Sequence, residues 1–118
     1  MKQKYKFLIK RIFYYFYGEK FFKRLNYDWK KYPSRIEIIQ HVINKKKFKN
    51  YLEIGCDKNE NFDKIIINKK VGVDPQRGGT LRMTSDDFFN KNNEKFDIIF
   101  LDGLHTYYQT IKDINNSL

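Results

Sequence analysis

Apolar residues recur along the chain at two spacings, one typical of buried strands and the other of helices. Residues 51–55, 71–75 and 96–103 are short apolar runs that end in Gly, in an acidic residue or in both. Residues 61–68 and 107–118 carry apolar side chains at helical spacing, and Phe62, Ile65 and Ile66 are expected to face inward. This strand–helix–strand alternation predicts an α/β fold with a parallel sheet.

A helix over residues 34–46 has the clearest start in the chain. Ser34 followed by Glu37 has the spacing of a capping box, and three lysines stand at the end, where the helix dipole favours cations. His41 lies between apolar positions of this helix. The pattern favours a partly buried structural histidine over a metal ligand, because no second ligand is spaced to join it.

Two further elements are expected between residues 76 and 95. Leu81–Met83 can add a short strand, and Ser85 can cap a helix that runs to about Lys91 with Phe88 or Phe89 inward. Because crossovers between parallel strands are right-handed, the four strands are expected in the order 3-2-1-4.

The N-terminal residues form a different pattern, an amphipathic helix that Gly18 ends. Lysine and arginine flank an apolar side made of Tyr5, Leu8, Ile9, Ile12, Phe13 and Phe16. This side can pack on the rest of the fold or on a partner subunit. Alternatively, residues 1–25 can lie on an anionic membrane surface, and nucleic acid is the least favoured partner.

Charge divides the chain in the same way. Its 118 residues carry a net charge of +10, and residues 1–50 hold 15 basic and 3 acidic groups, against 9 and 11 in residues 51–118. We therefore distinguish a basic, aromatic helical segment, residues 1–49, from an α/β domain, residues 50–118. The single Cys56 excludes a disulfide framework and suits the cytoplasm, with a location peripheral to the membrane as the alternative.

In open parallel sheets, ligands bind beyond the carboxyl ends of the strands, where residues 55–59, 74–79 and 102–106 are expected to converge. Asp74 follows Glu53 by 21 residues, a separation at which a carboxylate can accept hydrogen bonds from the hydroxyls of a nucleotide ribose. The structural alternative for Asp74 is a turn former ahead of Pro75.

The runs YLEIGC, VGVDP and FDIIFLDGLHTY resemble class I S-adenosylmethionine-dependent methyltransferases, especially the group that methylates oxygen atoms of small molecules and sugars. The resemblance covers residues 50–118 and implies a Rossmann-like sheet, S-adenosylmethionine as cofactor and a small-molecule methyl acceptor. It implies that Glu53 and Gly55 contact the methionine part, that Asp74 takes the ribose, that Ser85 and Asp86 lie near adenine, and that Asp102 and His105 line the methyl-transfer pocket.

The chemistry implied requires alignment of a nucleophile and removal of its proton. His105 is the best candidate for the base, and Asp102 can orient it or ligate a divalent cation. Two ligands do not make a metal site, so no metal site is predicted. A nicotinamide-dependent oxidoreductase is disfavoured because the residues after Gly55 lack the G-x-G-x-x-G fingerprint.

Two departures from the family's pattern bear on this interpretation. Asn59 stands where the family has a second Gly, although Asn tolerates a left-handed backbone. The family sheet has seven strands, so the chain is expected to be truncated and to leave a strand edge and an apolar helix face exposed. The alternative function is therefore a non-catalytic fragment that binds a membrane surface or a partner, and a homo-oligomer is also compatible.

Overall fold

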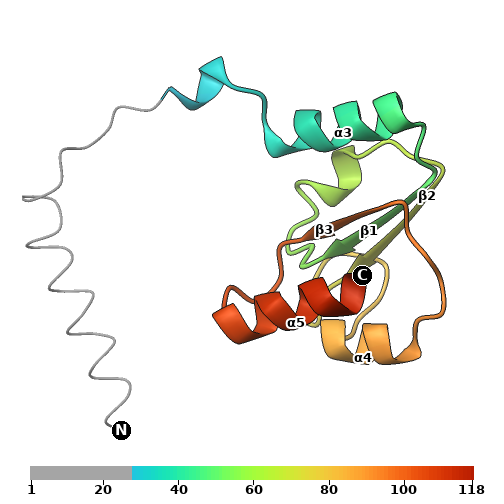
Figure 1. Cartoon of the computed structure of the whole chain (residues 1–118). Coiled ribbons are helices and arrows are strands. Elements are labelled where there is room, and N and C mark those ends of the chain that lie inside the picture. Colours follow the sequence, from blue (N-terminus) through green and yellow to red (C-terminus); the bar gives the residue numbers. More distant parts are fainter. Residues whose placement is uncertain (1–27) are drawn as a thin grey trace, which may run out of the picture. The chain divides into compact units, whose positions relative to one another are not determined.

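The structure is a computed structural model that describes residues 28–118, with a parallel sheet at their centre (Figure 1). Strand β1 (Asn50–Ile54) lies between β2 (Lys69–Val73) and β3 (Ile98–Leu101), and it is parallel to both. The predicted α/β class and the parallel sheet are therefore confirmed.

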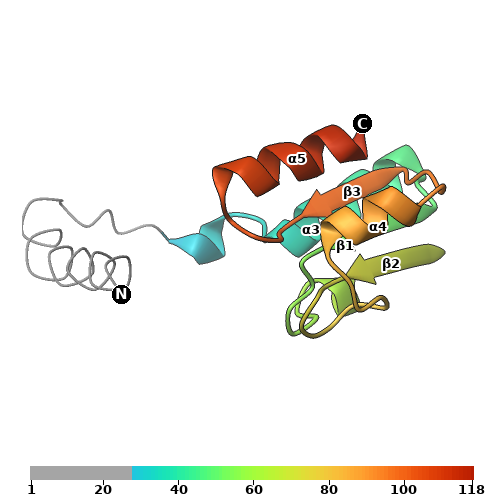
Figure 2. The same cartoon turned by 90° about the horizontal axis from the view of Figure 1, so that it is seen from below.

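Helices cover both faces of this sheet. Helix α3 (Arg35–Lys46) lies on one face, and α4 (Ser85–Lys91) and α5 (Tyr107–Ser117) lie on the other (Figures 1 and 2). Side chains alternate along β1, so that Tyr51 packs toward α3 while Leu52 and Ile54 pack toward α4. Helix α3 and the sheet belong to one compact unit, Pro33–Leu118.

Helix α3 begins as predicted. The Ser34 hydroxyl accepts a hydrogen bond from the Glu37 backbone N–H at 3.3 Å, and the Glu37 carboxylate accepts one from the Ser34 N–H at 2.6 Å. Both halves of the capping box are thus present. Ile39 and Ile43 are buried, whereas His41 is exposed because it lies on the opposite side of the helix, so its predicted partial burial is wrong.

The helix predicted over residues 61–68 is not formed. Only a 3-10 turn, η3 (Phe62–Lys64), is present, and the chain then runs extended from Ile65. The consecutive isoleucines 65, 66 and 67 are β-branched and disfavour a helix. Phe62 and Ile65 are buried as predicted, but Ile66 is 79% exposed.

The strand expected at Leu81–Met83 is present only as a single parallel bridge between Leu81 and Val73. Helix α4 begins four residues after Leu81, which leaves no length for a ladder. The residue that caps α4 is Thr84 and not Ser85, because the Thr84 hydroxyl accepts from the Asp87 N–H at 3.1 Å. Phe88 is buried as predicted.

Three observations complete the fold. The amphipathic helix predicted before Gly18 falls outside the described residues, which begin with Asp28 and the 3-10 turn η2 (Trp29–Lys31). Helix α5 matches the element predicted at residues 107–118. From Asp28 onward, no helix has the length and apolar character needed to cross a membrane.

Candidate functional site

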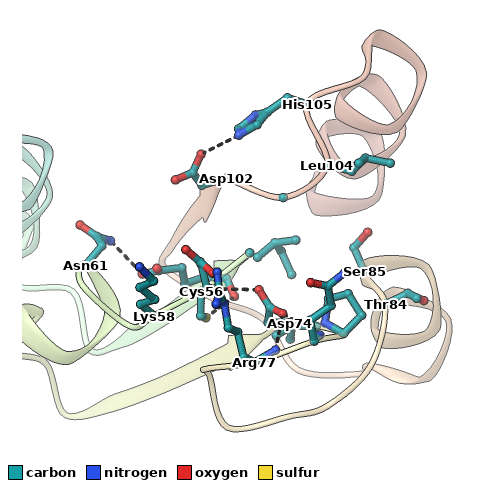
Figure 3. A pocket seen from close by; sticks show the side chains of 18 of the residues that line it. Cys56, Lys58, Asn61, Asp74, Arg77, Thr84, Ser85, Asp102, Leu104 and His105 are labelled. Atoms are coloured by element: carbon teal, nitrogen blue, oxygen red, sulfur yellow. Dashed lines mark hydrogen bonds and ion pairs between the residues drawn. The ribbon is translucent and has the colours of Figure 1, made fainter. Parts of the chain in front are cut away.

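A cavity of about 600 Å³ opens at the carboxyl ends of the three strands. Its lining comes from the loops after each strand, from the start of α4, and from single residues of α3 and α5. All seven residues that the sequence singled out contribute to it: Glu53, Gly55, Asp74, Ser85, Asp86, Asp102 and His105. Figure 3 shows Asp102 and His105 on one side of this cavity and Asp74, Thr84 and Ser85 on the other.

The turn after β1 depends on residues that tolerate a left-handed backbone. Gly55 has φ +86°, and a Cβ there would lie 2.2 Å from the backbone oxygen of Asp102, so only glycine fits. Asn59 has φ 63°, the left-handed backbone that asparagine was expected to tolerate here. Its side-chain oxygen accepts a hydrogen bond from the Gly79 N–H at 2.7 Å. This hydrogen bond therefore connects the loop after β1 with the loop after β2.

The Asp74 carboxylate organises the turn that follows β2. It accepts hydrogen bonds from the backbone N–H groups of Asp57 at 3.0 Å, Gln76 at 2.8 Å and Arg77 at 2.9 Å. Burial alone would raise the pKa of Asp74, but these donors together hold it below its ordinary value of 3.8. Because a carboxylate has about four lone-pair sites, about one remains for a ligand. Asp74 therefore forms the turn ahead of Pro75, which is the structural role that the sequence left open.

Glu53 lies at the floor of the cavity and is 1% exposed. Its carboxyl group accepts hydrogen bonds from the Tyr51 hydroxyl and, at 2.8 Å, from the Asn61 side-chain amide. Burial raises the pKa of Glu53 and outweighs these two hydrogen bonds, which lower it. Burial also raises the pKa of Tyr51, so its hydroxyl remains a donor.

Asn61 has a buried oxygen with no hydrogen-bond partner within residues 28–118. The residue is 3% exposed and lines the cavity beside Glu53. An unpaired buried acceptor is costly in free energy, and the amide nitrogen of Asn61, not this oxygen, faces Glu53.

Asp102 follows β3 and is paired with a residue from α3. Its carboxylate accepts a hydrogen bond at 3.0 Å from the guanidinium of Arg35, whose side chain is half exposed. The second carboxylate oxygen lies 3.6 Å from Nε2 of His105, whose side chain is 82% exposed. The predicted Asp102–His105 pair is therefore adjacent, but it is too long for a hydrogen bond.

Ser85 and Asp86 are held by α5. The side-chain amide nitrogen of Gln109 donates toward the Ser85 hydroxyl at 3.2 Å and the Asp86 carboxylate at 3.1 Å. The same nitrogen lies 2.9 Å from the buried carboxylate of Asp113, and Lys112 donates to Asp86 at 2.6 Å. The hydrogen bond from Lys112 holds the pKa of Asp86 below its ordinary value.

Sequence reasoning missed Arg35, Asn61 and Gln109. Arg35 lies 67 residues from Asp102 and only appeared as part of a helix start, so no local pattern connects them. Cys56 also lines the cavity, but burial raises the pKa of its thiol to about 12, and it stays protonated. The part of the chain from Asp28 to Leu118 contains no group of three or more His, Cys, Asp or Glu side chains that could hold a metal ion.

Comparisons of the chain with protein-family models, with curated proteins and with solved structures found no match. The geometry of the cavity and the chemistry of its lining therefore carry the functional assignment.

Proposed function

We propose that this chain binds S-adenosylmethionine and transfers its methyl group to a hydroxyl of a small molecule or sugar. The observation that carries the proposal is the convergence of seven residues, chosen from the sequence alone, on one cavity at the carboxyl ends of parallel strands. A volume of about 600 Å³ lies within the range of small-molecule sites.

The lining fits the chemistry of this cofactor at three points. The carboxyl group of Glu53, which lines the cavity at the end of β1, suits the ammonium group of the methionine part. The absence of a side chain at Gly55 lets a ligand approach the backbone. The remaining lone-pair site of Asp74 suits one ribose hydroxyl, and Ser85 and Asp86 suit the adenine end.

A Rossmann-like arrangement in the order 3-2-1-4 belongs to the same proposal. The parallel bridge between Leu81 and Val73 lies on the side of β2 that faces away from β1. The bridge puts Leu81 at the outer edge of β2, the place that the predicted order gives to its third strand, although this segment is too short to form a ladder.

When bound, S-adenosylmethionine supplies a methyl group that is already activated by the sulfonium. The protein then has to orient the acceptor and take its proton. We assign removal of this proton to His105, whose side chain lines the cavity and is 82% exposed. Asp102, fixed by Arg35, is the positioning residue for the imidazolium that forms.

A second candidate, cofactor binding without turnover, is favoured by one observation. The imidazole of His105 is 82% exposed and lies 3.6 Å from the Asp102 carboxylate, so no hydrogen bond fixes its orientation. The two candidates share the cofactor site and differ only in the role of His105.

Calorimetric titration with S-adenosylmethionine tests the shared part. Binding is expected, and Asp86→Asn should weaken it about tenfold to a hundredfold, because one charge-assisted hydrogen bond is lost. Asp87→Asn is the matched control. It removes the same charge from the next residue of α4, whose side chain does not line the cavity. No binding by the wild-type chain, or equal losses in the two variants, would contradict the proposal.

A further inference from the structure

Helix α5 is oriented with its apolar side away from the sheet. Asp113, which is buried, and Gln109, which is half buried, face the rest of the fold. The opposite side carries a row that we call the α5 stripe, and it consists of Tyr107, Ile111, Ile114 and Leu118. These four positions fall within about 60° of one another around the helix axis.

The stripe is the largest concentration of exposed apolar side chains in the part of the chain that begins at Asp28. Exposure is 75% for Tyr107, 42% for Ile111 and 41% for Ile114. Leu104 and Tyr108 extend the patch and are 66% and 85% exposed. A contiguous apolar patch of this kind marks an interaction surface more often than bare solvent contact.

We propose that a second copy of this chain covers the α5 stripe, with the two copies related by a two-fold axis. The spacing of 4, 3 and 4 residues along the stripe is that of the apolar seam between two paired helices. A two-fold axis places the same surface of each copy in contact, so a charged residue near the axis would lie close to the same charged residue of the other copy.

Charge favours a second copy over other occupants. The flanks of the stripe carry Tyr108, Thr110, Asn115 and Ser117, all uncharged, and the nearest cation, Lys112, is paired with Asp86. In a chain of net charge +10, this neutral face can meet itself without repulsion. It also lacks the basic flanks with which a helix binds an anionic membrane.

The sheet edge agrees with this arrangement. β3 pairs with β1 alone in the sheet of residues 28–118, and Figure 2 shows α5 running along the side of β3 that faces away from β1. An open edge is a template for another strand, and the four residues of β3 are all uncharged. A two-fold axis beside β3 would therefore bring α5 to α5 and β3 to β3.

Sedimentation equilibrium of the full chain tests the proposal. A dimer is expected, and the double variant Ile111→Glu/Ile114→Glu should raise its dissociation constant at least about a hundredfold, because charges replace apolar contacts on both copies. Ile38→Glu is the matched control, since Ile38 is 52% exposed on α3, and it should leave the constant unchanged.

Mixing two oppositely charged variants shows whether a loss of dimer comes from charge at the interface or from misfolding. The variant Ile111→Lys/Ile114→Lys should also be monomeric, and mixing it with the glutamate variant should restore a dimer, because opposite charges then meet across the axis. A wild-type chain that stays monomeric at every concentration would overturn the proposal.

Discussion

Two carboxyl groups, Glu53 in β1 and Asp97 directly before β3, have pKa values displaced in opposite directions. Burial raises the pKa of Glu53 above its ordinary value of 4.5. Backbone N–H groups of Lys49 and Asn50 donate to Asp97 at 2.7 and 3.0 Å and lower its pKa below 3.8. One residue therefore favours its protonated form in the folded chain, and the other favours its charged form.

This opposition predicts opposite pH profiles for two variants. The Glu53 carboxyl stabilises the fold below pH 4.5 and loses that contribution as pH rises through its higher folded-state pKa, so Glu53→Gln should gain stability over wild type with rising pH. The Asp97 contribution is present above pH 3.8 and is lost as pH falls, so Asp97→Asn should be destabilised at neutral pH and match wild type in acid. Melting temperatures measured from pH 3 to pH 8 check both, and parallel profiles would contradict the assignment.

Among the elements, the extended segment after η3 is held by a single side chain of α3. The Gln40 oxygen accepts from the Ile66 N–H at 2.8 Å, and its nitrogen donates to the Ile66 carbonyl at 2.9 Å. The amide thus replaces the strand partner that Ile66 lacks. The ammonium of Lys70 also donates to the carbonyl of Ile65 at 3.1 Å. These contacts stabilise an extended path where helical spacing was present in the sequence.

Gln40→Ala should lower the melting temperature by about 4 to 8 °C, because the loss of both hydrogen bonds costs about 1 kcal/mol at this partly exposed position. Gln40 also donates to the side-chain oxygen of Asn44 within α3 at 3.0 Å. Because alanine is the better helix former, a net loss would come mainly from the contact with Ile66. His41→Ala is the control, since His41 lies next to Gln40 on α3 and is exposed. Equal melting temperatures for the two variants would mean that Gln40 contributes nothing.

Local signals explain which elements were predictable. The capping box at Ser34 and the apolar runs of the strands act over a few residues, and the structure confirms them. The helix predicted at residues 61–68 was wrong because the partner that decides the backbone, Gln40, lies 26 residues from Ile66. The cap of α4 was misplaced by one residue because Thr84 and Ser85 are both good caps, and only the hydrogen bond to Asp87 distinguishes them.

For the whole molecule, the same distinction between local and distant contacts applies to the site. Strand ends are local features, so Glu53, Gly55, Asp74, Asp102 and His105 could be collected from the sequence, and parallel pairing brings them to one cavity. Ser85 and Asp86 lie at the start of α4 and came from the family resemblance. Arg35, Asn61 and Gln109 reach the cavity through tertiary packing, for which the sequence carries no spacing rule. The packing also determines how many backbone N–H groups donate to the Asp74 carboxylate, and no sequence motif reveals that number.

The substitution of His105 separates turnover from binding alone. If His105 takes the proton of the acceptor, His105→Ala should lower turnover by about 10²- to 10⁴-fold and leave cofactor affinity nearly intact, because a general base acts in the transition state. His41→Ala is the matched control, since it removes the other histidine, which is exposed and outside the cavity lining.

The measurements are the release of S-adenosylhomocysteine with a panel of hydroxylated small molecules and sugars, the calorimetric affinity and the melting temperature of each variant. If His105 only packs the loop after Asp102, His105→Ala would instead lower cofactor affinity and melting temperature together. The 82% exposure of the His105 side chain argues against that outcome, because so exposed a ring contributes little packing. Turnover by His105→Ala close to that of His41→Ala would remove His105 from the mechanism, and cofactor binding by a wild-type chain without any turnover would favour the non-catalytic candidate.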